Sequence, residues 1–344
     1  MKPSIKEFID IVSNNLSKQD YPKGYKLGKH WKTHVEENLL VANQIAIEMP
    51  DDNQAAYFFN KVRRDANSRD PGFDHNDHEP VNYYNRIVNS AGHRNFNTII
   101  ETGTGFGNTA RIFHIRQANS CYVLVDLPEN LIYSYAFINM HFPDAKIDIV
   151  LDKEFRFNLC DFIFCPIQQL SNLNIPNVDL YLNTYSLGEM PQPSIDHVLK
   201  HIQRLKPKYI YSENIMFANK KYLYDAGRED SSEIVLNLQP QWLPLLFEFN
   251  WQIMEVHRYI VSALLERVEL PVELLIEALL AERNRTEKDW IKDYYFAALY
   301  DKQYTDKFLD ILERYNINSG CLNTPNYDFN KIGEVIWFRR RLGQ

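Results

Sequence analysis

The chain has 344 residues, of which 45% are hydrophobic and 24% are charged, so it can bury the core of one large domain or two ordinary ones. Its formal net charge of −7 argues against a general nucleic-acid binder, which usually carries a basic excess. No apolar run approaches the roughly 20 residues of a membrane span, and the N-terminus lacks the apolar core of a signal peptide. The four cysteines lie mostly in apolar runs, which favours buried thiols in a reducing cytoplasm over a zinc site.

Residues 1–70 are expected to be mostly helical. Apolar residues recur at helical spacing from Ile5 to Leu16, a second helix is expected from about His34 to Ile47, and a third follows the capping residues Asp51 to Asn53. This pattern predicts a helical N-terminal cap, whose surface could also form a homo-oligomer.

A polar segment bounded by proline and glycine follows, from Arg69 to Pro80, and is expected to be a loop. It holds His75, His78 and three carboxylates between Asp74 and Glu79. Such a cluster could bind a metal or supply a base near a substrate, or it could be an ordinary solvated loop. We expect no metal site here.

From residue 97 onward, apolar strand-like runs alternate with helical patterns. This alternation predicts a parallel sheet with helices on both faces, in which ligands bind at the carboxyl ends of the strands. A long helical insert is expected after a strand at Tyr209–Ser212, with a further strand at Gln252–Tyr259. The expected strands and helices of the alternation are Thr98–Glu101, Asn108–Gln117, Tyr122–Asp126, Glu129–His141, Lys146–Leu151, Asp161–Cys165, Asp179–Asn183 and Ile195–Leu205.

Residues 265–344 are expected to form a helical extension. An apolar stripe runs from Val268 to Leu279, two more helical patterns follow, and a short strand is expected at Glu334–Phe338. The predicted organisation is therefore a helical cap over 1–70, a nucleotide-binding domain over 71–264 and a helical C-terminal extension over 265–344.

The stretch Glu101 to Thr109 is the centre of the predicted domain. A strand ends in Glu101, glycines occupy positions 103, 105 and 107, and a helix begins at Asn108. Such a turn lets a ligand approach the backbone closely and exposes free N–H groups to it. It serves both dinucleotides and S-adenosylmethionine.

The form of the turn favours S-adenosylmethionine. A dinucleotide turn reads G-x-G-x-x-G, but Asn108 stands at its third glycine position and Gly107 comes one residue early. Glu101 at the strand end would repel a pyrophosphate, whereas it suits the ammonium and sulfonium of S-adenosylmethionine. Gly103, Gly105 and Gly107 would then allow close approach of the amino-acid and ribose parts.

Residues at the ends of three later strands complete the expected cofactor site. Asp126, followed by Leu127, ends the second strand at the spacing of an acid that binds both ribose hydroxyls, or it is simply a helix N-terminal charge. Ile167 could pack on adenine and Gln168 could read its amine, although Gln168 could equally be a surface residue. Asn183 ends a further strand and is expected, with Ser186 and Asn214, to line the site.

Four segments together resemble the bacterial sugar O-methyltransferases, which are class I S-adenosylmethionine-dependent enzymes. They are Glu101–Gly107, Asp126–Glu129, Asn183–Met190 and Glu213-Asn214, and the resemblance covers roughly residues 95–260. It implies a Rossmann-like class I methyltransferase sheet and O-methylation of a sugar or glycan precursor (EC 2.1.1.-) in polysaccharide biosynthesis.

A sugar hydroxyl is a weak nucleophile, so a general base would assist the transfer. Glu189 is the first candidate, although it could instead charge a helix N-terminus. His257 and His78 are the others, and His257 could be a structural histidine of a strand. Two further classes remain open: a Rossmann-type oxidoreductase or epimerase that uses NAD, and a non-catalytic scaffold on a methyltransferase fold.

Overall fold

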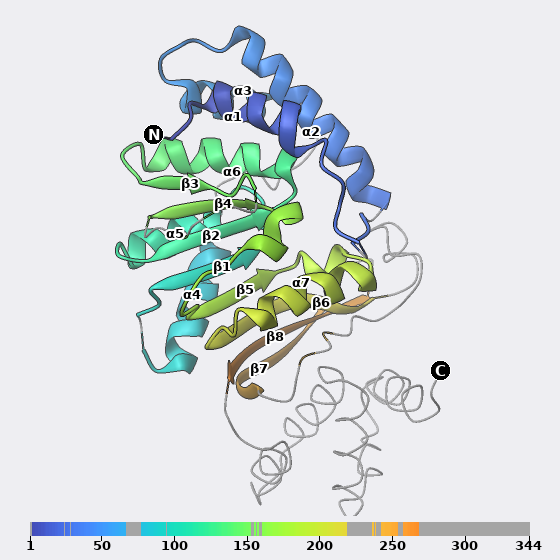
Figure 1. The fold of residues 1–344 in the computed structure, drawn as a ribbon. Helices are drawn as coiled ribbons and strands as arrows, with labels where there is room; N and C mark the ends of the chain where they lie inside the picture. Colours follow the sequence, from blue (N-terminus) through green and yellow to red (C-terminus); the bar gives the residue numbers. More distant parts are fainter. Residues whose placement is uncertain are drawn as a thin grey trace, which may run out of the picture.

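The computed structural model describes residues 2–23, 25–27, 29–66, 77–93, 95–152, 155, 157, 160–218, 236, 238, 242–253 and 257–267. An eight-stranded sheet in the order β3-β4-β2-β1-β5-β6-β8-β7 forms the centre of this part (Figure 1). Its strands are β1 Thr98–Thr102, β2 Cys121–Asp126, β3 Ile147–Ile149, β4 Phe162–Pro166, β5 Leu180–Thr184, β6 Tyr209–Ala218, β7 Trp242–Ile253 and β8 His257–Arg267.

The strands from β3 to β6 pair in parallel, and β8 pairs antiparallel with both β6 and β7. The helices between the parallel strands are α5 (Asn108–Arg116), α6 (Pro128–His141) and α7 (Gln192–Arg204). The expected Rossmann-like α/β fold is therefore confirmed. The five strands expected between residues 98 and 184 form within two residues of their expected boundaries.

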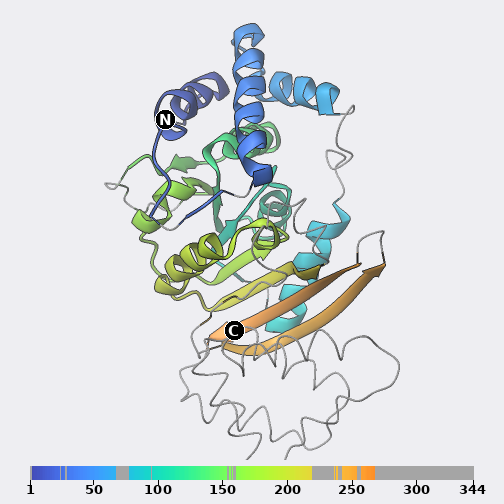
Figure 2. The ribbon, with the colours of Figure 1, turned by 90° about the vertical axis from the view of Figure 1, so that its right-hand side faces the viewer.

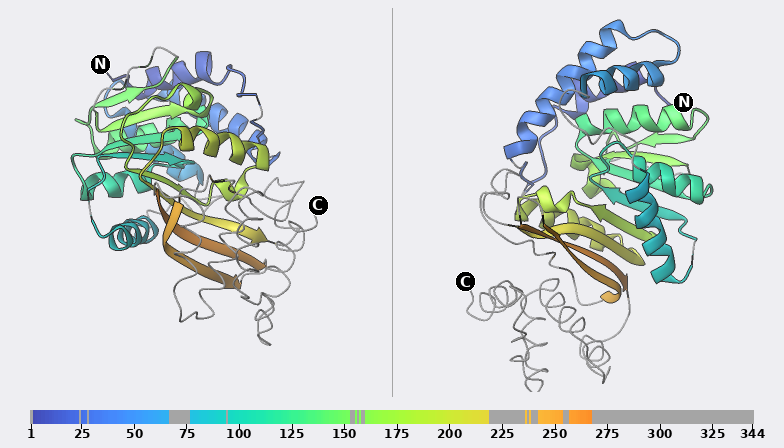
Figure 3. Two further views of the ribbon diagram at one scale, coloured as in Figure 1. Left: turned by 60° about the horizontal axis from the view of Figure 1, so that its bottom comes forward. Right: turned by 180° about the vertical axis from the view of Figure 1, so that it is seen from behind.

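Successive side chains along a strand point to opposite faces of the sheet, so each strand contributes to two different cores. Ile99 and Leu124 face the core beneath α4 (His78–Ala91), α5 and α6. Ile100 and Val123 face the opposite core, beneath α7 and a 3-10 turn at Ile167–Asn172. Seen from behind, α4 and α5 lie on the face away from α7 (Figure 3). Helices thus cover both faces of the sheet, as expected.

The N-terminal region is helical over most of its described length. Ser4 and Glu7 form a capping box that starts α1 (Ile5–Ile11), which continues into a π-helical turn, and α2 (Lys29–Glu48) and α3 (Gln54–Ala66) follow. These three helices contact α6, and they lie over the end of the sheet that carries β3 (Figures 1 and 2). Between α1 and α2 the chain crosses to the α7 side, where Tyr25 and Trp31 pack on the second core.

Two expectations about local structure were wrong. The expected loop over 69–80 ends at Asp77, because His78 begins α4. The expected helical insert after β6 does not extend to residue 252, because β7 occupies Trp242–Ile253 and pairs along its length with β8. The strand expected at Gln252–Tyr259 instead covers the end of β7 and the start of β8. The pairing of β8 with both β6 and β7 decides the structure of this region.

β8 runs to Arg267, across the expected boundary at residue 264. The helices and the short strand expected after it, and the loop residues 69–76, lie outside the described residues. No helix in the described ranges is long and apolar enough to cross a membrane.

Candidate functional site

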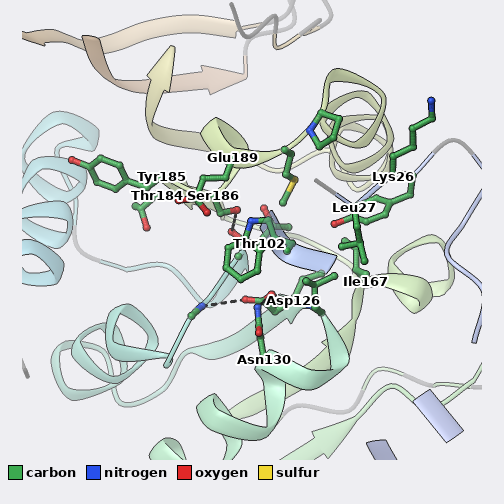
Figure 4. Close-up of a pocket in the computed structure, with 18 residues that line it drawn as sticks. Lys26, Leu27, Thr102, Asp126, Asn130, Ile167, Thr184, Tyr185, Ser186 and Glu189 are labelled. Carbon is green, nitrogen blue, oxygen red and sulfur yellow. Dashed lines mark hydrogen bonds between the residues drawn. The ribbon is translucent and has the colours of Figure 1, made fainter. Parts of the chain in front are cut away.

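A cleft opens at the carboxyl ends of β1, β2, β4 and β5, between the glycine turn and the N-terminal segment (Figure 4). The chain leaves β1 toward β2 on one side, whereas β5 lies on the other side, so the cleft sits where strand order reverses. Ligands of open α/β sheets bind at this kind of switch point. The cleft holds about 830 Å³ of empty space, part of it open to solvent.

The glycine turn provides two different surfaces. Gly103 and Gly105 both have left-handed φ angles, of 72° and 52°, and both line the cleft. A Cβ at Gly103 would lie 2.0 Å from Ser186 Oγ, whereas a Cβ at Gly105 would meet nothing within 4 Å. Gly103 therefore lets the β5 loop approach, and Gly105 leaves room for a ligand beside the backbone.

Gly107 is placed differently from the other two glycines. It does not line the cleft, and its φ of 81° starts α5. A Cβ there would lie 3.3 Å from Leu124 Cδ2 and 3.4 Å from Ser134 Cβ. The missing side chain at Gly107 thus allows close packing of α5 on β2 and α6.

Asp126 lines the cleft as expected and is held by several donors. Its carboxylate accepts hydrogen bonds from the backbone N–H of Leu127 at 2.7 Å and of Gly105 at 3.1 Å, and from Asn130 Nδ2 at 3.0 Å. Burial raises its pKa, and these hydrogen bonds oppose that shift. The carboxylate thereby ties the end of β2 to the glycine turn and stays at the cleft wall.

Glu101, expected to face a cationic ligand, is not among the residues that line the cleft. Its side chain is 1% exposed, and its carboxylate accepts hydrogen bonds from Tyr122 Oη, at 2.9 Å, and from Thr109. Burial raises its pKa to about 8. The position before the glycine turn points to the α5 side of the sheet because side chains alternate along β1.

Asn183 also supports the cleft from beneath and does not line it. It is fully buried, and its Nδ2 donates to the carbonyl of Thr102 at 2.7 Å and to Ser186 Oγ at 2.9 Å. Its Oδ1 accepts from the backbone N–H of Leu187 at 3.0 Å. Asn214 is buried beside it and accepts from Gly188 N–H at 3.1 Å. Both amides fix the loop that carries Ser186, which does line the cleft.

Of the residues expected near adenine, two line the cleft and one does not. Ile167 and Leu127 line the cleft and are almost fully buried, so they offer an apolar wall. Gln168 is buried outside the cleft lining, and its Oε1 has no hydrogen-bond partner among the described residues.

Glu189 lines the cleft, as a candidate base must. It ends a short 3-10 turn (Leu187–Glu189) after β5. Burial raises its pKa to about 7, and the charge of Asp126 adds to this shift, whereas the polar group of Trp31 opposes it. A carboxylate with a pKa near 7 suits general-base chemistry at neutral pH.

Of the two candidate histidines, His78 does not line the cleft. His78 is exposed at the start of α4, where its Nδ1 lies 3.1 Å from Asn82 Nδ2. His257 begins β8, and its side chain lies outside the described part. Among the described residues, no group of three or more His, Cys, Asp or Glu side chains could hold a metal.

Several cleft residues were not predicted from sequence. The N-terminal segment supplies Tyr25, Lys26, Leu27 and Trp31, and no local pattern connects a segment before the first strand with the carboxyl edge of the sheet. Tyr185 belongs to the Asn183–Met190 segment singled out in the sequence and lines the cleft, but its left-handed φ of 63°, unusual for tyrosine, is visible only in the structure. The remaining unpredicted residues that line the cleft are Thr102, Val125, Asn130, Thr184, Met190 and Pro191.

The charge of the cleft is set by its carboxylates. Asp126 and Glu189 line it, and the side chain of Lys26 points away from it into solvent (Figure 4). A cation is favoured in such a site and a pyrophosphate is disfavoured. The open side of Gly105, the hydroxyl-accepting carboxylate of Asp126 and the apolar wall of Ile167 fit a nucleoside with a positively charged tail.

No protein-family model and no curated protein matches the chain. Solved structures with a similar fold include EvdMO1, which is 12% identical with a TM-score of 0.35, over 55% of this chain and 41% of the length of EvdMO1. Magnesium protoporphyrin IX methyltransferase from Synechocystis PCC 6803, solved with SAH, is 9% identical with a TM-score of 0.37, over 56% of this chain and 84% of that one. Human N-acetylserotonin methyltransferase, solved with SAM, is 12% identical with a TM-score of 0.33, over 70% and 67%. Identities this low describe a likeness of fold alone.

Proposed function

We propose that the protein is an S-adenosylmethionine-dependent O-methyltransferase that acts on a hydroxyl of a sugar or glycan precursor. The observation that supports this most strongly is the cleft at the strand-order switch. This cleft is lined by a left-handed glycine turn and by the carboxylates of Asp126 and Glu189. Lys26 is the only cationic residue of its described lining, and its side chain points away from the cleft. The sugar acceptor rests on the sequence resemblance.

The residues have separate roles in this proposal. Asp126 would accept hydrogen bonds from the ribose hydroxyls, Gly105 would let the amino-acid part pass close to the backbone, and Ile167 and Leu127 would pack against adenine. Bound S-adenosylmethionine supplies a methyl group on a cationic sulfur. Glu189 would accept the proton of the acceptor hydroxyl, and the apolar walls would exclude water from the aligned reactants.

Calorimetric titration of the full chain with S-adenosylmethionine, S-adenosylhomocysteine and NAD tests the cofactor. We expect the first two to bind and NAD not to bind. Failure of both S-adenosyl compounds to bind would refute the proposal, and binding of NAD alone would favour an oxidoreductase or epimerase.

Transfer of a labelled methyl group to a panel of free sugars, nucleotide sugars and oligosaccharides tests the acceptor. Wild-type protein should label at least one of them, and Glu189→Gln should bind S-adenosylmethionine equally well while its turnover falls by about 10²- to 10⁴-fold. Unchanged turnover in this variant would remove Glu189 as the base. Asn130→Ala, which changes another cleft residue, is the control for a general loss of the site.

A further inference from the structure

A second cavity lies at the opposite edge of the sheet from the cleft. It is bounded by α4, by the residues that lead into β1 and by the turn between α5 and β2, so it opens at the amino ends of two parallel strands. It contains about 1110 Å³ of empty space, part of it open to solvent. None of its described lining residues also lines the cleft, so the two sites are separate.

Amide side chains dominate the wall of this cavity, which we call the amide pocket. Five of them form no side-chain hydrogen bond with a described residue: Asn85, Asn89, Asn95, Asn97 and Asn119. In a sixth, Gln117, Oε1 accepts the N–H of Phe96 at 3.0 Å, and Nε2 has no partner among the described residues. The wall thus offers hydrogen-bond donors and acceptors side by side. Hydroxyl groups match such a wall because each of them both donates and accepts.

The amide pocket carries one positive charge and no negative charge among its described residues. The guanidinium of Arg116 lies 5.8 Å from the centre of the Tyr84 ring and forms no ion pair within the described part of the chain. Asp179 does not line the pocket, and its carboxylate accepts the backbone N–H groups of Asn97 and Thr98 at 2.6 and 3.2 Å. In a chain with a net charge of −7, a pocket with this balance favours a ligand with one anionic group.

The pocket offers little apolar surface. Its apolar lining residues are Tyr84, Val88 and Phe96, which are only 5%, 6% and 1% exposed. A lipid or a flat aromatic ligand would therefore bury little area there. One arginine is also too few to neutralise the polyphosphate of a nucleotide. A small ligand with many hydroxyls and one carboxylate remains, because a guanidinium can bind a carboxylate through two parallel hydrogen bonds.

We propose that the amide pocket binds a uronic acid unit of a saccharide, with its ring hydroxyls bonded to the amide side chains and its carboxylate paired with Arg116. Binding involves no covalent step and no residue of the cleft. The inference therefore goes beyond the proposed methyl transfer and does not depend on it.

A titration with four probes tests the ligand class. The full chain is labelled with ¹⁵N, its side-chain amide signals are followed by NMR, and the probes are glucuronate, galacturonate, glucose and acetate. Glucose keeps the hydroxyls without the carboxylate, and acetate keeps the carboxylate without the hydroxyls. We expect at least one uronate to bind with millimolar affinity, about fivefold or more tighter than glucose and acetate. Absence of binding by both uronates, or equally tight binding of glucose or acetate, would overturn the inference.

Substitutions then test where the uronate binds. Arg116→Gln should weaken its binding by about tenfold because the charge-assisted pair is lost, and the double change Asn85→Ala and Asn89→Ala should weaken it by about fivefold. The controls are Lys200→Gln, which removes an exposed positive charge from α7, and Asn82→Ala, which removes an amide of α4 outside the pocket lining. Both controls should bind the uronate like wild type. Uronate affinity that is unchanged in the pocket variants would mean that it binds elsewhere, and the inference would fail.

The positions chosen keep the fold out of the result. Arg116, Asn85 and Asn89 are exposed, so these variants should unfold at the temperature of the wild type. Titration of the same samples with S-adenosylmethionine separates the two proposals. Binding of the uronate without the cofactor would support this inference and refute the proposed function, and binding of the cofactor without the uronate would do the reverse.

Discussion

At the scale of single residues, glycines with similar backbone angles have different neighbours. Gly103 and Gly105 both adopt left-handed φ values, which cost about 1–2 kcal/mol for a residue with a Cβ. Only at Gly103 would a Cβ also collide with Ser186, whereas the space beside Gly105 is empty. The glycine at 103 thus allows close packing of the protein, and the glycine at 105 leaves open space in the cleft.

This contrast predicts different effects of two matched substitutions. Gly103→Ala should lower the free energy of unfolding by more than Gly105→Ala, which we expect to cost about 1–2 kcal/mol. Gly105→Ala should weaken S-adenosylmethionine binding by tenfold or more because its methyl group occupies the open side of the turn. Denaturant unfolding and calorimetry measure the two effects, and equal unfolding free energies would contradict the assignment.

The pKa of Glu189 predicts the pH dependence of the proposed reaction. A general base must be ionised to act, and the pKa of Glu189 is raised to about 7 by burial. The rate of methyl transfer should therefore rise with pH through about 7 and then level off. A rate that is flat between pH 6 and 8, measured with saturating cofactor, would argue against Glu189 as the base.

At the scale of elements, the N-terminal segment and α7 act together. Ser194 exchanges two hydrogen bonds with the backbone of Lys26, so α7 fixes the segment that carries Tyr25 and Trp31. The first turn of α7 thus holds one wall of the cleft in place, and the loop that follows β5 forms another.

Ser194→Ala should loosen this wall. We expect a loss of about 1–2 kcal/mol in unfolding free energy, since two hydrogen bonds vanish, and a several-fold weaker affinity for S-adenosylmethionine. The control is Ser134→Ala, because Ser134 is equally buried but bonds only to Leu131 of its own helix. Identical behaviour of the two variants in thermal unfolding and calorimetry would show that the link to Lys26 contributes nothing.

At the scale of the whole molecule, several carboxyl groups are buried with raised pKa values. Burial raises the pKa of Glu101 to about 8 and those of Glu129 and Glu189 to about 7. Glu129 Oε2 has no hydrogen-bond partner among the described residues. The folded state therefore binds more protons than the unfolded state between the ordinary glutamate pKa of 4.5 and about 7 to 8.

The protein without ligand should lose stability as pH rises through this window. The sign follows from linkage, because stability falls with pH wherever the folded state holds more protons. Thermal unfolding should occur several degrees lower at pH 8 than at pH 6. Glu101→Gln, which mimics the protonated group, should flatten this slope, and an unchanged slope would mean that Glu101 is ionised in the folded protein at both pH values.

Much of the α/β core could be predicted from local sequence patterns. The strands from Thr98 to Thr184 could be predicted because buried parallel strands are short apolar runs between helical patterns, and Asp126 could be placed because the end of β2 must lie beside the end of β1. The bounds of β7 and β8 could not, since β8 is held by its pairing with β6 and β7 by its pairing with β8. The start of α4 could not be predicted either, because its first residue, His78, lies in a segment with the composition of a loop.

The sequence by itself determined the strands from Thr98 to Thr184, the glycine turn and the acidic residue at the end of the second strand, because each depends on residues that are neighbours in the chain. Only the tertiary structure decided which side chains face the cleft. It turned Glu101 and Gly107 inward to the protein core and brought Tyr25 and Trp31 to the cleft from the N-terminal segment. The reason is physical: the direction of a side chain at a strand end and the path of a distant segment follow from packing between elements, and no local spacing encodes that packing.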